Sequence, residues 1–132
     1  PDVVARLYQG LGIRVSDPVK AKDYLTKSVA VGMNNIFSLK ARIFLIGLET
    51  DKVKAVADAQ DVAKNFWKIC KLEFGSGDAL LPFVRDFCTA ISDKTTNEEY
   101  LSIVNTVLKS IPADMQWSSV LSFLKSEIEK LK

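Results

Sequence analysis

The chain has 132 residues, of which 48% are hydrophobic, and its 18 basic and 16 acidic side chains give a net charge of +2. This size and composition are those of one domain with a buried core, and so small a net charge does not by itself indicate a nucleic-acid surface. The chain contains no histidine, the usual general base and the commonest metal ligand, which excludes most hydrolase sites and most metal sites.

The first predicted helix begins at Asp17 and Pro18, because a capping residue precedes a proline at the first helical position. It extends to about residue 33, where Asn34 and Asn35 end it. Its apolar side contains Val19, Tyr24, Leu25 and Val29. The second predicted helix, residues 36–48, is apolar almost all round, which indicates an element enclosed by its neighbours.

The third predicted helix follows Thr50 or Asp51 and spans residues 52–74. Its apolar residues recur at the spacings of three and four that mark one face of a helix. The segment Gly75–Gly77 resembles part of a phosphate-binding loop, but it follows a helix and lacks the Gly-Lys-Ser/Thr that such loops require. We therefore expect it to be a linker that ends the helix.

The fourth predicted helix begins at Asp78 and the sixth at Asp114, each an N-terminal capping residue, and the sixth runs to the C-terminus. The fifth begins at Thr96 or Asn97 and ends at residues 110–112. No segment alternates polar and apolar residues as a strand does. The pattern therefore predicts an all-α domain of six to seven antiparallel helices in an α-α array or irregular helical bundle.

One apolar pattern occurs twice, 17 residues apart: Tyr100, Ile103, Val104, Val107 and Ile111, then Trp117, Val120, Leu121, Leu124 and Ile128. Any two amphipathic helices share these spacings, which is one interpretation. The other is a HEAT-like array, in which each helix packs mainly on its neighbours in sequence.

Adjacent carboxylates stand at Glu98 and Glu99, in the first turn of the fifth predicted helix. An acid/base pair is one interpretation, but neighbouring residues on a helix point in different directions and share a proton poorly. Acidic side chains also complement the partial positive charge of a helix N-terminus. We expect this pair to stabilise the helix.

The two cysteines, Cys70 and Cys88, form no CxxC pair and so no zinc or redox motif. Both lie in apolar stripes, which predicts buried, unreactive thiols and an intracellular location, cytoplasmic or nuclear. The longest apolar run, residues 36–48, contains Lys40 and Arg42 and falls short of the ~20 apolar residues that cross a bilayer. We expect no membrane span, no metal and no cofactor.

The third predicted helix carries the strongest candidate for a binding surface. Lys64, Lys68 and Lys71 recur at spacings of four and three and therefore share one face, beside Trp67. Such lysines could contact phosphates, nucleic acid or an acidic protein. Because Asp61 lies one turn before Lys64, a solvated face without a partner is the other interpretation.

The later helices carry a resemblance to a known family. The succession of Phe83–Phe87 (FVRDF), Asn97–Leu108 and Trp117–Ile128 resembles the helical C-terminal domain of the larger Ku subunit of DNA end-joining, over about the last two-thirds of the chain. The resemblance implies a nuclear protein-interaction domain in double-strand-break repair, without catalysis of its own. The family's short acidic partner-binding tail does not occur at Lys132, so neither that interaction nor any site residue is transferred.

We expect a single helical domain over residues 1–132, whole or excised from a longer protein, that acts without catalysis in protein-protein interaction or as a scaffold. Two alternatives stay open. The apolar segment 36–48 would suit a carrier of lipid or another apolar ligand, which requires an apolar cavity above ~300 Å³. The lysine stripe would suit a nucleic-acid-binding domain, whose association would weaken steeply with salt. The sequence indicates neither the identity of the partner nor the oligomeric state.

Overall fold

The computed structural model describes residues 2–31, 36–70, 81–111 and 118–131. Within these ranges the chain forms seven α-helices and no strand, which confirms the predicted all-α fold. The helices are α1 (Asp2–Arg14), α2 (Pro18–Val31), α3 (Ile36–Leu48), α4 (Lys52–Cys70), α5 (Leu81–Ser92), α6 (Asn97–Lys109) and α7 (Ser118–Glu129).

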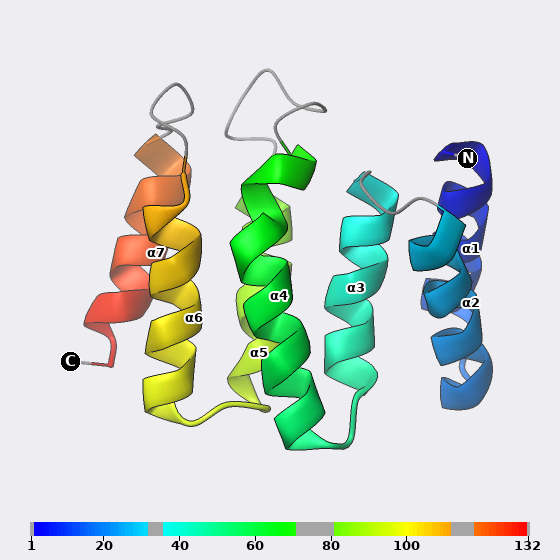
Figure 1. The fold of residues 1–132 in the computed structure, drawn as a ribbon, viewed down its shortest axis with the longest axis horizontal. Helices are drawn as coiled ribbons and strands as arrows, with labels where there is room; N and C mark the ends of the chain where they lie inside the picture. The colour runs from blue at the N-terminus through cyan, green and yellow to red at the C-terminus, as the bar shows by residue number, and fades with distance from the viewer. Residues whose placement is uncertain (1, 32–35, 71–80, 112–117, 132) are drawn as a thin grey trace.

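The described helices lie side by side, from α1 and α2 at one end of the molecule to α6 and α7 at the other (Figure 1). Consecutive helices run in opposite directions (Figure 1). The odd-numbered helices α1, α3, α5 and α7 contact one another in that order and form one layer, while α4 contacts α6 in the other. The arrangement is a two-layered α-α array, with the odd-numbered helices along one side.

A continuous apolar core extends through α3, α4, α5, α6 and α7. Near its centre Phe66 of α4 is fully buried, and its ring centroid lies 5.1 Å from that of Trp67 and 5.8 Å from that of Phe87 on α5. Three small residues of α4 are also fully buried: Ala55, Ala59 and Ala63. Because these side chains are short, α3 and α6 can both pack closely on α4.

Helix α1 is not predicted from the sequence, because Gly10 and Gly12 each lower its intrinsic helix propensity by about 1 kcal/mol. Its packing on α2 compensates. A Cβ atom at Gly12 would lie 2.6 Å from Cγ of the fully buried Leu25, so only glycine allows this close approach of the two helices. The rings of Tyr8 and Tyr24 stack beside it, with their centroids 6.3 Å apart.

Capping hydrogen bonds confirm several of the predicted helix starts. Asp17 Oδ1 and Asp51 Oδ1 each accept a hydrogen bond from the backbone N–H two residues later, at 2.9 and 3.0 Å. At α6, Thr96 Oγ1 accepts from the N–H of Glu99 at 3.2 Å, and Glu99 Oε1 accepts from the N–H of Thr96 at 2.8 Å. Glu99 is therefore a capping residue, as expected from its place in the first turn.

Two details of the predicted helices are wrong. Val19 does not join the apolar side of α2, since it lies in the first turn and is 78% exposed. The last helix ends at Glu129 instead of continuing to the C-terminus, and a turn follows it. Several predicted boundaries lie outside the described residues: Asn34, Asn35, Gly75–Gly77, Asp78 and Asp114.

Candidate functional site

The predicted lysine stripe of α4 is described only in part. Lys64 is exposed, whereas the side chain of Lys68 and the whole of Lys71 lie outside what the structure describes. Trp67 is only 3% exposed, and its indole Nε1 donates a hydrogen bond to the carbonyl oxygen of Val107 on α6 at 2.8 Å. Trp67 thus joins α4 to α6 in the core and is not available at the surface. Binding at the lysines stays a prediction.

Apolar side chains of α1 face solvent along a groove of about 650 Å³, which α1 shares with Lys40 of α3. Leu7 is 62% exposed, and Leu11, one turn later, is 45% exposed. A surface helix normally turns its apolar stripe towards the core, but in α1 the close packing on α2 is made by Gly12 on another side. We call this hollow the α1–α3 groove. Its lining includes Arg6, Leu7, Leu11, Ile13, Arg14 and Lys40.

Of the described residues that line the α1–α3 groove, three are cations, Arg6, Arg14 and Lys40, and none carries a carboxylate. Among the described residues, no carboxylate lies within ion-pair distance of Arg6, Arg14 or Lys40. The guanidinium of Arg6 lies over the ring of Phe37 on α3, 5.8 Å from its centroid. This contact holds one cation at the border between the two helices, beside exposed apolar surface.

A second apolar hollow, of about 260 Å³, lies between α3 and α5. Phe44 and Leu48 of α3 border it and are partly exposed, and Asp86 of α5 lies on its other side. Lys40, Phe44 and Leu48 follow one another at intervals of four residues, so the same side of α3 borders both hollows. The layer of odd-numbered helices therefore carries exposed apolar residues across α1 and α3.

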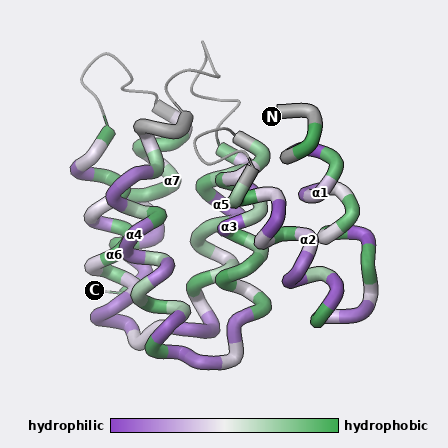
Figure 2. The backbone as a smooth tube through the Cα atoms, turned by 45° about the vertical axis from the view of Figure 1, so that its right-hand side comes forward, coloured by the Kyte–Doolittle hydropathy of each residue, from purple (hydrophilic) through white to green (hydrophobic). Residues whose placement is uncertain are grey.

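The outward side of α3 corrects the prediction that neighbours enclose this helix completely. Figure 2 shows its tube largely in the hydrophobic colours. Leu39, Ile43 and Ile46 enter the core, but Phe44 and Leu48 do not. The hydrophobicity that suggested a ligand carrier is thus used partly in packing and partly on an open surface. The α3–α5 hollow is smaller than the ~300 Å³ expected of a ligand cavity, but the α1–α3 groove is larger, so a ligand carrier stays a prediction.

The residues of this site were not predicted, although the sequence holds a signal for them. Val4, Leu7 and Leu11 recur at spacings of three and four, and Tyr8 and Gly12 lie on an adjoining side of the same helix. Together these residues make the apolar face of α1 wider than a single neighbouring helix can bury. What the sequence alone does not show is which of the two sides α2 takes.

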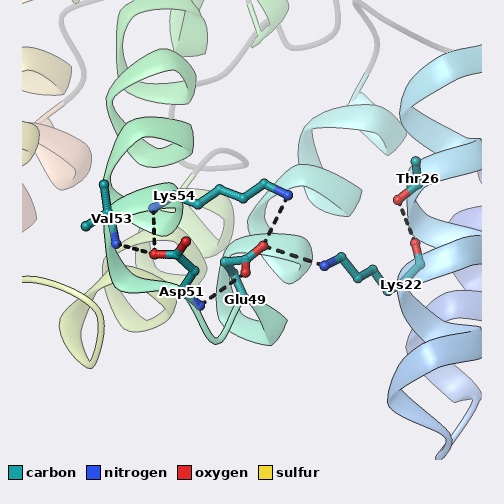
Figure 3. A network of polar contacts seen from close by, with 6 residues as sticks. All are labelled: Lys22, Thr26, Glu49, Asp51, Val53 and Lys54. Atoms are coloured by element: carbon teal, nitrogen blue, oxygen red, sulfur yellow. Dashed lines mark hydrogen bonds and ion pairs between the residues drawn. The ribbon is translucent and has the colours of Figure 1, made fainter.

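A charged network fixes the start of α4 to α2 and α3 (Figure 3). Glu49, at the end of α3, is buried, and its Oε2 lies 3.6 Å from Lys22 Nζ of α2 and 3.4 Å from Lys54 Nζ of α4. Its Oε1 accepts a hydrogen bond from the N–H of Asp51 at 3.1 Å. This hydrogen bond, together with the two ammonium groups, holds the pKa of Glu49 below its ordinary value, although desolvation acts the other way.

Replacing Glu49 with glutamine is expected to lower thermal stability at neutral pH and to leave it unchanged in strong acid. Because the pKa of Glu49 is lower in the folded state, its stabilising effect is complete above the ordinary carboxyl pKa and is lost as the pH falls through the folded value. Thermal unfolding of both proteins, followed by circular dichroism from about pH 7 to about pH 2, checks this. A gap in Tm that persists at the lowest pH would contradict it.

A second polar cluster joins α6 to α7. Tyr100 donates its phenolic hydrogen to Glu127 Oε1 at 2.8 Å, and Lys130 Nζ lies 2.6 Å from Glu127 Oε2. Burial raises the pKa of Tyr100, and the nearby Cys88 adds to this effect. Desolvation opposes ionisation of Glu127, but the hydrogen bonds from Lys130 and Tyr100 outweigh it and lower its pKa. Near neutral pH the phenol keeps its proton, and the ionised carboxylate accepts one hydrogen bond on each oxygen, from Tyr100 and from Lys130.

Cys88 lies beside this cluster, fully inside the core, as predicted. Burial raises the pKa of its thiol to about 12, so almost no thiolate forms at neutral pH. The reactive form of cysteine is the thiolate. Cys88 is therefore a packing residue, while the side chain of Cys70 lies outside the described residues.

Comparison of the chain with protein-family models, with curated proteins and with solved structures found no match. In the described part of the chain, no helix combines the length and apolar character needed to cross a bilayer. The same residues contain no group of three or more Cys, Asp or Glu side chains placed to hold a metal ion.

Proposed function

We propose that this chain is a non-enzymatic domain for protein-protein interaction or scaffolding, and that it uses the layer of α1, α3 and α5 as its docking surface. The observation that carries the proposal is the run of exposed apolar side chains on α1 and α3: Leu7, Leu11, Phe44 and Leu48. Single exposed apolar residues are ordinary, but these four border two hollows on neighbouring helices, and exposed apolar surface gathered at grooves is typical of interaction sites. Helical arrays bind partners on extended surfaces of this kind.

The chemistry of the other polar clusters supports a role without catalysis. Raised pKa values keep the Tyr100 phenol and the Cys88 thiol protonated, which is not the form of a base or a nucleophile. The carboxylate of Glu127 is ionised, but both of its oxygens accept hydrogen bonds, from Tyr100 and Lys130. The resemblance to the helical C-terminal domain of the larger Ku subunit agrees with an interaction domain and extends the proposal to a nuclear role in double-strand-break repair.

The experiment that tests this function compares three forms of the domain as baits in affinity capture. One is the wild type, the second carries Leu7→Ser and Leu11→Ser, and the third carries Lys64→Glu, Lys68→Glu and Lys71→Glu. We expect partners of the wild type to be lost from the leucine variant and kept by the lysine variant. Circular dichroism checks that the leucine variant is folded, as expected because both side chains are exposed.

The opposite pattern, loss with the lysine variant alone, would move the interface to the exposed side of α4. Partners that both variants retain would rule out both surfaces. Loss of bound material in proportion to salt, with nuclease-sensitive recovery, would indicate nucleic acid as the partner.

A further inference from the structure

The α1–α3 groove suits the binding of a helix, because its exposed leucines are spaced like those of an amphipathic helix. Leu7 and Leu11 are one turn apart, and Arg14 completes a second turn, so the groove wall on α1 is about 10 Å long at 1.5 Å per residue. Exposed apolar residues at spacings of three and four match the stripe of an amphipathic helix that lies along them. Apolar contact with Leu7 and Leu11, which share one side of α1, would supply the buried centre of such an interface.

The positive charges beside this apolar wall favour a partner that carries carboxylates. Arg6 and Arg14 lie eight residues apart on α1, and Lys40 lies across the groove on α3. Among the described residues, their positive charge has no counterpart in the lining of the groove or in an ion pair. Carboxylates of a partner would complete it, and the guanidinium of arginine can bind a carboxylate through two hydrogen bonds.

A partner that either pairs only with the cations or contacts only the apolar surface would bind this groove poorly. A nucleic-acid backbone would pair with Arg6, Arg14 and Lys40 but would place phosphates against Leu7 and Leu11, which costs the desolvation of charged groups without compensation. A purely apolar segment would leave three cations to be partly desolvated without partners. A segment with an apolar stripe flanked by aspartate or glutamate satisfies both.

We propose that the α1–α3 groove binds an acidic amphipathic helix of a partner protein, with its apolar stripe on Leu7 and Leu11 and its carboxylates on Arg6, Arg14 and Lys40. This inference rests on the proposed function, since it names the class of partner that the docking surface takes.

The test measures binding of three synthetic peptides of about 15 residues, long enough to form a helix, to the full chain by fluorescence anisotropy. The first has leucines at spacings of three and four flanked by glutamates. The second carries lysine in place of each glutamate, and the third has the composition of the first in scrambled order. We expect only the first to bind, with an affinity that falls as salt is raised.

Two variants with equal changes in net charge locate the effect. Arg6→Glu, Arg14→Glu and Lys40→Glu together are expected to weaken binding of the glutamate peptide about tenfold or more. The matched control, Lys20→Glu, Lys109→Glu and Lys125→Glu, changes exposed lysines of α2, α6 and α7 and should leave the affinity within about twofold. If charge reversal in the groove unfolds the chain, the glutamine versions of the same residues replace it and are expected to weaken binding by a smaller factor.

Each other outcome overturns the inference in its own way. Equal binding of the glutamate and lysine peptides, weakened by Leu7→Ser and Leu11→Ser, would leave the docking surface and the proposed function intact but refute the acidic partner. Absence of binding by any peptide would refute the helix-in-groove model, and the capture experiment would then decide the proposed function separately. Self-association of the chain that the leucine variant abolishes would assign the groove to a second copy.

Discussion

Replacing Phe66 with alanine is expected to lower the free energy of unfolding by about 3–5 kcal/mol. Phe66 is fully buried, and its ring meets those of Trp67 and Phe87 at the centre of the core. The substitution removes the transfer free energy of the ring and leaves a cavity that the surrounding helices fill only in part. Because whole domains are stable by only about 5–15 kcal/mol, the loss is a large fraction of the total.

Urea denaturation followed by circular dichroism measures this change, and Phe44→Ala on α3 is the matched control. Phe44 undergoes the same chemical change, but it is 36% exposed at the border of the α3–α5 hollow. We expect it to cost less than about half as much, since part of its ring already contacts water. Equal losses at the two positions would mean that the core is not organised around Phe66.

Alanine at Gly12 is expected to destabilise the chain by about 1–3 kcal/mol, whereas alanine at Gly10 stabilises it by about 0.5–1 kcal/mol. Both glycines belong to α1, so the gain in helix propensity is the same. The difference lies in the space around them. A Cβ at Gly12 would meet Leu25 Cγ at 2.6 Å and the carbonyl oxygen of Ala21 at 3.2 Å, whereas no atom lies within 4 Å of a Cβ at Gly10.

The two single variants therefore differ by one methyl group on one helix and are expected to shift Tm in opposite directions. Thermal unfolding measures both shifts in the same buffer. Equal shifts of the same sign would show that α1 does not pack on α2 through Gly12. Because Gly12→Ala displaces α1, it is also expected to weaken partner binding in the α1–α3 groove.

Most of the helices could be predicted from local signals in the sequence, namely capping residues and apolar runs. Asp17, Asp51 and Thr96 cap helices where the pattern places them, because a cap is a short-range hydrogen bond that its own residues determine. The bounds of α3 follow in the same way from its apolar run. Helix α1 was missed, since its stability comes from contact with α2 and outweighs the low propensity of its two glycines.

The candidate site was less predictable, because exposure depends on tertiary contacts. Spacing placed Trp67 beside the lysines of α4, but the wide apolar side of α4 takes it into the core, where it bonds Val107. The spacing of apolar residues also does not identify the exposed side of α3, because α3 is apolar almost all round. Which of its residues are buried depends on where the neighbouring helices pack. The proposed docking surface thus depends on how the helices pack in the array rather than on any one helix.

Among the residues that the structure describes, the continuous apolar core begins at α3 and includes none from α1 or α2. Both helices pack on α3, and Lys22 of α2 forms an ion pair with Glu49 at the end of α3. Because α1 and α2 contribute no described residue to that core, we expect them to open as a separate cooperative segment, at a lower free-energy cost than unfolding of the whole domain. A ligand that bridges α1 and Lys40 of α3 binds only the closed form, so occupancy of the groove would suppress that opening and slow amide hydrogen exchange throughout α1 and α2.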